Sequence, residues 1–208
     1  MKFEDIPQFT CDGNYVVNVS WRYLEEQLNH YKKEFNLQLD PDFQRPHVWT
    51  LEKQERYIEF ILRGGKSSRD IYFNQPYWMR WKRDDDLKNP LVLVDGKQRL
   101  NAAKLFLNNK IKAFGCYCKE FEDSLHPTVD FIFHVNSLPT RKEVLQWYLD
   151  LNSGGVVHTE EELNHVRKLL SKEINGVNLI DLDYSQVEAR LLAAYYDKGI
   201  KRKAIKTK

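Results

Sequence analysis

The residues best suited to chemistry are five consecutive ones, Asp95-Gly96-Lys97-Gln98-Arg99. They follow an apolar run at residues 90–94 that is typical of a buried strand, and they precede apolar residues at helical spacing. A strand that turns through a glycine into a helix leaves N–H groups of the first helical turn unpaired, which favours an anion there. Arg99 can clamp a phosphate with two bonds, Lys97 adds a point charge, and the Asp95 carboxylate suits Mg²⁺ or a general base. The alternative is an ordinary strand–helix turn with solvated charges.

A second candidate is the loop at residues 37–49, which has two prolines and no helical period. It places an aromatic ring, an amide and a guanidinium in succession at Phe43, Gln44 and Arg45. Loops that carry these groups together often bind ligands. Because Arg45 precedes a proline, it could equally brace the loop by bonding backbone carbonyls.

A third candidate is the stretch at residues 75–89, which has no clear period and reads as an excursion between two strands. Its aromatic and basic residues could form a stacking and phosphate-binding surface for single-stranded nucleic acid. Three consecutive aspartates beside them would repel that same backbone, and a hairpin whose tryptophans pack on the domain is the alternative. The residues concerned are Trp78, Arg80, Trp81, Lys82 and Arg83.

The remaining patterns predict the elements that position these residues. Strands are expected at residues 14–19, 70–74, 90–94, 112–121 and 129–135, from β-branched runs and alternation. Helices are expected after four cap residues, Ser20, Thr50, Thr140 and Thr159, and after the turn at Gly96. Leu51 and Leu151 are expected to face the core. His134 either reaches a site or, as is commoner, lies partly buried with its hydrogen bonds satisfied.

Composition sets the outer limits. The chain has 208 residues, of which 42% are hydrophobic and 13% aromatic, enough for a cored domain with appendages. A net charge of +2 does not single out nucleic acid as a partner. No apolar run approaches a membrane span and no signal pattern opens the chain, so we expect no membrane partner and a cytoplasmic location. The cysteines Cys11, Cys116 and Cys118 are expected to be reduced structural thiols rather than metal ligands.

Three blocks together resemble one protein family. They are residues 42–49 (Asp-Phe-Gln-Arg-Pro-His-Val-Trp), residues 95–100 (Asp-Gly-Lys-Gln-Arg-Leu), and residues 151–155 (Leu-Asn-Ser-Gly-Gly) followed by Glu161-Glu162-Leu163. Their order and separations resemble the N-terminal domain of GmrSD-type (type IV) modification-dependent restriction enzymes over roughly residues 14–170. The resemblance implies an α+β fold similar to ParB and sulfiredoxin, with a mixed sheet and flanking helices.

The same resemblance implies a nucleotide pocket. In that family the aromatic-Gln-Arg loop and the Asp-Gly-Gln-Gln-Arg turn line the pocket, and nucleoside triphosphate hydrolysis regulates a partner nuclease domain. Carried over residue by residue, the pocket here would be lined by Gln44, Arg45, Asp95, Gly96, Gln98 and Arg99, with Asp95 and Gln98 as catalytic candidates and Asp95 as an Mg²⁺ ligand. Phe43 and Lys97 are added from the residue types alone. Lys97 stands where the family usually has glutamine, and the family's nuclease half is not expected within this chain.

The last segment has a separate likeness. Residues 182–193 resemble the first carboxylate motif of family A DNA polymerases, with Asp183 at the metal-binding aspartate. Two-metal nucleotidyl transfer needs a second carboxylate, and nothing else in the sequence resembles one, so a docking helix is expected.

For the chain as a whole we predict an arm at residues 1–13, the main domain at 14–170, a strand–helix extension at 171–197 and a basic tail at 198–208.

Two functions from different classes follow. The first is a regulatory domain in phage–host or restriction biology that binds a nucleoside triphosphate with Mg²⁺, with or without slow hydrolysis. The second is a non-catalytic interaction protein on the same fold that binds a host protein or DNA.

Overall fold

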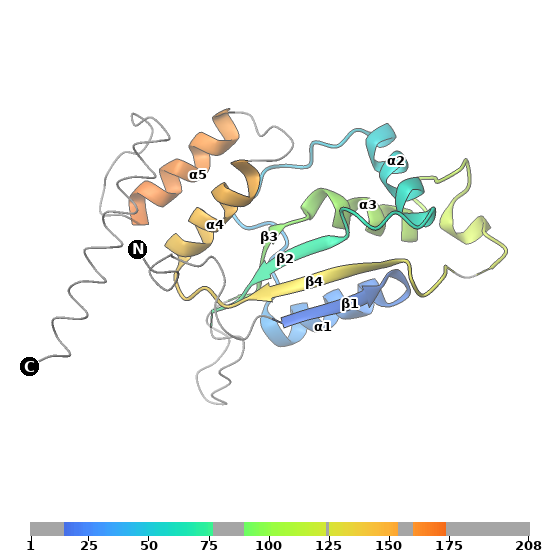
Figure 1. The fold of residues 1–208 in the computed structure, drawn as a ribbon, viewed down its shortest axis with the longest axis horizontal. Coiled ribbons are helices and arrows are strands. Elements are labelled where there is room, and N and C mark those ends of the chain that lie inside the picture. Colours follow the sequence, from blue (N-terminus) through green and yellow to red (C-terminus); the bar gives the residue numbers. More distant parts are fainter. Residues whose placement is uncertain (1–14, 77–89, 124, 154–159, 174–208) are drawn as a thin grey trace, which may run out of the picture. The chain divides into compact units, whose positions relative to one another are not determined.

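The computed structural model of the chain describes residues 15–76, 90–123, 125–153 and 160–173 (Figure 1). Its strands are β1 (Tyr15–Ser20), β2 (Asp70–Asn74), β3 (Val92–Asp95) and β4 (Asp130–Asn136). Its helices are α1 (Leu24–Phe35), α2 (Leu51–Leu62), α3 (Lys97–Leu107), α4 (Arg141–Ser153) and α5 (Glu160–Glu173), with short 3₁₀ turns η2 (Trp21–Tyr23) and η3 (Cys118–Glu120). The contacts divide the chain into two units, residues 1–156 and 157–208, and α5 belongs to the second.

The four strands form one mixed sheet in the order β1-β4-β2-β3. β1 runs antiparallel to β4, β4 runs parallel to β2, and β2 runs antiparallel to β3. The expected α+β fold with a mixed sheet and flanking helices is therefore confirmed.

Alternation along β4 separates a buried face of the sheet from a partly open one. Phe131, Phe133 and Val135 are buried, whereas His134 between them is only partly covered. α1 packs on the buried face, because the Tyr31 ring lies 6.1 Å from Phe73 and 6.2 Å from Phe133 between ring centroids. The core continues into α2 and α3, which pack on each other and bury Ile58, Ile61, Leu100 and Phe106.

Two helix starts follow their predicted caps. The Thr50 hydroxyl accepts the backbone N–H of Lys53 at the start of α2. At α4, the Thr140 N–H donates to the Glu143 carboxylate while the Glu143 N–H donates to the Thr140 hydroxyl, which is the reciprocal capping box. Both helix starts could be predicted from the sequence because each capping interaction is made within four consecutive residues.

Ser20 does not cap a helix as predicted. It ends β1, its hydroxyl makes no capping bond, and the chain first forms the 3₁₀ turn η2 before α1 begins at Leu24. The Trp21 side chain is fully buried and lies 5.3 Å from the Phe131 ring. Packing of this large ring against β4 thus takes precedence over the local capping preference.

The strand predicted at residues 112–121 is wrong. Ala113 and Cys116 exchange two backbone hydrogen bonds around Phe114 and Gly115, which have φ of +52° and +79°. A tight two-residue turn of this kind needs positive φ at both central positions, and it breaks the extended run. Cys118 then enters η3, so the two cysteines do not share a strand face, and burial raises the pKa of the Cys118 thiol.

Two side chains expected in the core are exposed instead. Leu51 is 57% exposed at the first position of α2, and Leu151 is 36% exposed near the end of α4. Both lie in terminal turns of their helices, where the apolar face of the helix extends beyond the part of the core that it packs against. No helix in the described ranges is long and apolar enough to cross a bilayer.

Several predictions concern residues outside the described ranges. They are the arm at 1–13, Cys11, the excursion with Arg80, Lys82 and Arg83, the cap at Thr159, and everything after residue 173, including Asp183.

Candidate functional site

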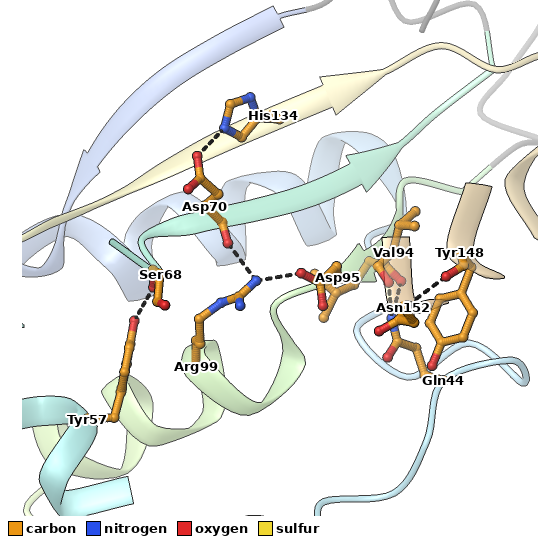
Figure 2. A network of polar contacts seen from close by, with 11 residues as sticks. Gln44, Tyr57, Ser68, Asp70, Val94, Asp95, Arg99, His134, Tyr148 and Asn152 are labelled. Atoms are coloured by element: carbon orange, nitrogen blue, oxygen red, sulfur yellow. Dashed lines mark hydrogen bonds and ion pairs between the residues drawn. The ribbon is translucent and has the colours of Figure 1, made fainter. Parts of the chain in front are cut away.

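The loop before α2 is tied to β3 by an amide side chain. The Gln44 Nε2 group donates to the carbonyl oxygens of Leu93 at 2.9 Å and Val94 at 2.8 Å (Figure 2). These two carbonyls lie on the strand that leads into the Asp95–Arg99 turn. The first and second sequence blocks therefore meet in space although about 50 residues separate them.

Gln98 makes the same connection from the other side. Its Nε2 donates to the Pro46 carbonyl at 3.0 Å, and its Oε1 accepts the N–H groups of Val48 at 3.1 Å and Trp49 at 3.3 Å. The side chain is 6% exposed. Gln98 thus holds the loop in place, and its catalytic assignment stays a prediction.

Lys97 and Arg45 meet through the Arg45 backbone. The Lys97 ammonium donates to the Arg45 carbonyl oxygen at 2.9 Å and forms an ion pair with Asp40. The Lys97 side chain is 18% exposed, whereas that of Asp40 is 76% exposed. The loop is therefore anchored next to the first turn of α3, while the prediction that Arg45 and Arg99 line one pocket stays a prediction.

Arg99 lies at the centre of a polar network. Its Nη2 donates to the Asp70 carbonyl oxygen at 2.9 Å and to the Asp95 Oδ2 at 2.6 Å (Figure 2). Its Nε is buried and has no hydrogen-bond partner among the described residues. The Arg99 side chain is 20% exposed and that of Asp95 is 33% exposed, so the ion pair remains open to solvent on one side.

The start of α3 carries basic rather than acidic side chains. Gly96 occupies the N-cap with φ of +101°, no side chain caps the helix, and its first turn has no acidic residue. That turn instead carries Lys97 and Arg99, at the helix end where the macrodipole is already positive. Glycine is favoured at the cap because L side chains rarely adopt this φ, and a Cβ there would also lie 2.5 Å from the Ile71 Cδ1 atom.

Phe43 has a packing role in the structure. It is 3% exposed, and its ring lies 5.3 Å from the Tyr148 ring of α4. It therefore packs the loop against α4, while the neighbouring Gln44 ties the loop to β3.

Three residues that the sequence did not single out together converge beside Arg99. Asp70 and Tyr72 lie on β2 and His134 on β4, and the strand register places Tyr72 between His134 and Asp95. The His134 ring stacks on Tyr72 with 4.6 Å between centroids, and its Nε2 lies 2.7 Å from the Asp70 Oδ1. Trp147 of α4 meets the Tyr72 ring edge-on at 6.0 Å. The sequence signal for these residues was the alternation of apolar and polar positions in β2 and β4, but alternation does not show which residues of the two strands lie opposite each other.

Burial raises the pKa of Tyr72, and the nearby carboxylates of Asp70 and Asp95 raise it further while Arg99 partly opposes them. The phenol therefore stays protonated and can donate a hydrogen bond.

A magnesium ion fits Asp95 only in a particular way. No group of three or more His, Cys, Asp or Glu side chains in the described ranges could hold a metal. Mg²⁺ at phosphate sites commonly takes one or two carboxylates and completes its shell with substrate oxygens and water. The partly exposed Asp95 suits that mode, in which a phosphate ligand would supply further oxygens.

Comparison with known proteins gives one match. The family model described as the N-terminal domain of GmrSD restriction endonuclease matches residues 24–173, which include the loop, the turn and helices α1 to α5. No curated protein matches the chain. No solved structure matches it either.

Proposed function

We propose, from the premise that this chain belongs to the family of GmrSD restriction endonuclease N-terminal domains, that it binds a nucleoside triphosphate at the first turn of α3. Membership places the chain in restriction biology. Within that setting the domain acts as a nucleotide-dependent regulator of a nuclease.

The observation that carries this proposal is the uncapped, cationic start of α3. Helices usually place acidic residues or a capping side chain at this end, because both stabilise the positive end of the macrodipole. Here Lys97 and Arg99 occupy the first turn instead, and Gly96 adds no side chain. In the free chain Asp40 and Asp95 pair with these two cations, and the same charges and unpaired N–H groups favour an anionic ligand at this end of the helix.

The surrounding contacts define a role for each side chain. Arg99 binds phosphate oxygens, and Lys97 adds charge when phosphate replaces Asp40. Asp40 is open to this exchange because its own side chain is 76% exposed. Gln44 and Gln98 hold the loop that presents Arg45.

Hydrolysis of the bound nucleotide is the finer part of the proposal. Asp95 holds Mg²⁺, which when bound would neutralise charge on the phosphates. Slow turnover then limits how long the domain stays in its nucleotide-bound state. A regulatory domain needs this lifetime more than it needs a high rate.

Isothermal titration calorimetry with each of the four ribonucleoside triphosphates and Mg²⁺ tests binding. A charge-assisted hydrogen bond from a guanidinium to phosphate contributes on the order of 1.5–3 kcal/mol, so Arg99→Ala should weaken affinity roughly ten- to a hundredfold. Arg99→Lys should rescue it poorly, because lysine keeps the charge but loses the planar fork. Arg56→Ala is the matched control, since Arg56 lies on α2 with a side chain 76% exposed.

A lysine variant with parental affinity would show that charge alone matters. A parent protein that binds none of the four nucleotides at millimolar concentration would overturn the proposal and favour the interaction-protein alternative.

Asp95→Asn tests hydrolysis separately. An interaction that matters mainly in the transition state lowers turnover much more than affinity. We expect steady-state phosphate release to fall strongly while the calorimetric affinity changes little. Equal turnover in variant and parent would remove Asp95 from the catalytic residues.

A further inference from the structure

We infer that the segment Asp40-Pro41-Asp42 couples the first turn of α3 to the first turn of α4, so that an anion held by Lys97 loosens the start of α4. The inference rests on the proposed function and deepens it, because it names the element that responds to the nucleotide. This coupling segment lies in the loop between α1 and α2.

The two carboxylates of the coupling segment contact different helices. Asp40 forms an ion pair with Lys97, the first residue of α3. The Nη2 group of Arg141, the first residue of α4, donates to both carboxylate oxygens of Asp42 at 2.8 Å. Two helix starts are therefore tied to acidic residues that flank a single proline.

The backbone between the two carboxylates is stiff. Pro41 is buried, and its carbonyl oxygen accepts the Gln44 N–H at 2.9 Å, which closes a turn. The proline ring fixes φ at its own position and restricts Asp40 to extended backbone. A rotation that moves Asp40 away from α3 is therefore passed on to Asp42 rather than absorbed by the chain between them.

Contacts on either side fix the ends of the coupling segment. Before it, Gln38 makes two backbone hydrogen bonds, at 2.8 and 3.0 Å, to the chain at residues 91–93. After it, the buried Phe43 ring packs on Tyr148, and Gln44 donates to two carbonyls of β3 (Figure 2). Movement is therefore confined to the few residues between these anchors.

Burial separates the exchangeable contacts from the fixed ones. The Asp42 and Arg141 side chains are 58% and 42% exposed, and ion pairs that are open to water in this way contribute little to folding stability. The Asp40 carboxylate is also well exposed, although the Lys97 ammonium that it meets is largely covered. Contacts of this kind are poor braces, but a competing charge can exchange them reversibly.

An anion on Lys97 disfavours Asp40 through its charge. The phosphates of a nucleotide are negative, and like charges at short range repel. Lys97 keeps its hydrogen bond to the Arg45 carbonyl, so the ammonium stays in place when the Asp40 carboxylate leaves for water. The stiff segment then turns, and the contact between Asp42 and Arg141 weakens.

Loss of that contact acts on the first turn of α4. Arg141 is a cation at the end of the helix where the macrodipole is already positive, which is unfavourable. The Asp42 carboxylate offsets this charge in the free chain. The start of α4 should therefore open more often when the carboxylate is withdrawn.

Hydrogen–deuterium exchange without nucleotide tests the coupling directly. In Asp40→Ala the carboxylate that ties the segment to Lys97 is gone. We expect the amides at residues 143–145 of α4 to exchange about two- to fivefold faster than in the parent, as for the loss of one exposed ion pair. Glu52→Ala is the matched control, because it removes a similarly exposed carboxylate that pairs with Arg56 on α2.

Exchange and calorimetry with Mg²⁺-nucleotide test the part of the ligand. Nucleotide should speed exchange at the start of α4 in the parent, and it should add no further change in Asp42→Ala, where the tie is already broken. Because coupling between two sites is reciprocal, Asp42→Ala should also bind nucleotide about two- to fivefold more tightly. Glu52→Ala should match the parent in both measurements.

The outcomes separate this inference from the proposed function. A parent that binds nucleotide with unchanged exchange at the start of α4 would overturn the inference and leave the proposed function standing. Parental α4 exchange in Asp40→Ala would overturn it without any ligand. A parent that binds no nucleotide would overturn the proposed function, and the exchange of Asp40→Ala would then decide alone whether the two helix starts are coupled.

Discussion

At the scale of single residues, the side chains of Gln44 and Gln98 make hydrogen bonds to backbone groups that strand pairing satisfies elsewhere in the fold. The loop between α1 and α2 contains no β-strand, yet its backbone N–H and C=O groups need hydrogen-bond partners. Gln98 supplies an acceptor for two loop N–H groups and a donor for one loop carbonyl. One buried amide thereby satisfies three backbone groups and fixes the distance between loop and turn.

This arrangement predicts the effect of Gln98→Leu. The change keeps the approximate volume but leaves the N–H groups of Val48 and Trp49 without their acceptor. Because an unsatisfied buried polar group costs about 1–3 kcal/mol, we expect a loss of that order in the free energy of unfolding. Urea titration measures it, with Asn29→Leu on an exposed position of α1 as the control.

Hydrogen exchange gives an independent check. The amides of Val48 and Trp49 should exchange much faster in Gln98→Leu, whereas those within α1 should not change. Unaltered protection at both loop amides would contradict the bracing role.

At the scale of elements, the junction of β3 and α3 depends on one backbone conformation. Gly96 has φ of +101°, a region that L side chains rarely adopt, and its Cα faces Ile71 closely. This conformation sets the direction of the first turn of α3, from which Lys97 contacts the loop and Arg99 contacts Asp70 and Asp95. The same glycine therefore sets the orientation of the helix and the geometry of the proposed phosphate site.

Gly96→Ala should lose more stability than Gly64→Ala, which forms a matched pair with it. Both glycines have positive φ, so both variants carry a backbone strain of roughly 1–2 kcal/mol. Only at Gly96 would the new methyl group also meet Ile71, which adds roughly 1–3 kcal/mol of overpacking. Chemical denaturation of the two variants measures the difference, and equal losses would contradict the close approach.

At the scale of the whole molecule, the sheet separates a sealed aromatic face from a partly open polar one. The sealed face holds two phenols whose ionisation the fold resists. The pKa of Tyr31 is raised to about 12, chiefly by burial and to a smaller extent by Tyr15, while a hydrogen bond with Gln27 partly opposes the rise. Burial also raises the pKa of Tyr57, whose hydroxyl donates to the Ser68 carbonyl at 2.9 Å.

These shifts predict a loss of stability in alkali. A pKa that is higher in the folded chain than the unfolded value near 10 favours folding below that pH, and the contribution is lost as pH rises toward the folded pKa. The free energy of unfolding should therefore fall between about pH 10 and 12, and Tyr31→Phe should reduce that fall. Tyr23→Phe is the control, because Tyr23 is 61% exposed. Identical alkaline slopes in Tyr31→Phe and the parent would contradict the burial effect.

Local patterns in the sequence determined the elements whose signals lie within a few residues. The alternation of β4, the Thr50 and Thr140 caps, and the glycine turn between β3 and α3 were all predicted because each depends on neighbouring residues. Local preference failed at Ser20, where burial of Trp21 decided the conformation, and at Phe114, which adopts positive φ without the usual Asn-Gly signal.

Tertiary structure alone decided how the site is assembled. The sequence marked Gln44, Arg45, Lys97, Gln98 and Arg99 as candidates, but not that the two glutamines would hold the loop by its backbone. It gave no indication that Asp70 and His134, 64 residues apart, would meet. Such meetings depend on strand order and register, which follow from burying one face of the sheet beneath distant helices. The packing energy that determines strand order and register is spread over the whole core, so no short stretch of sequence predicts it.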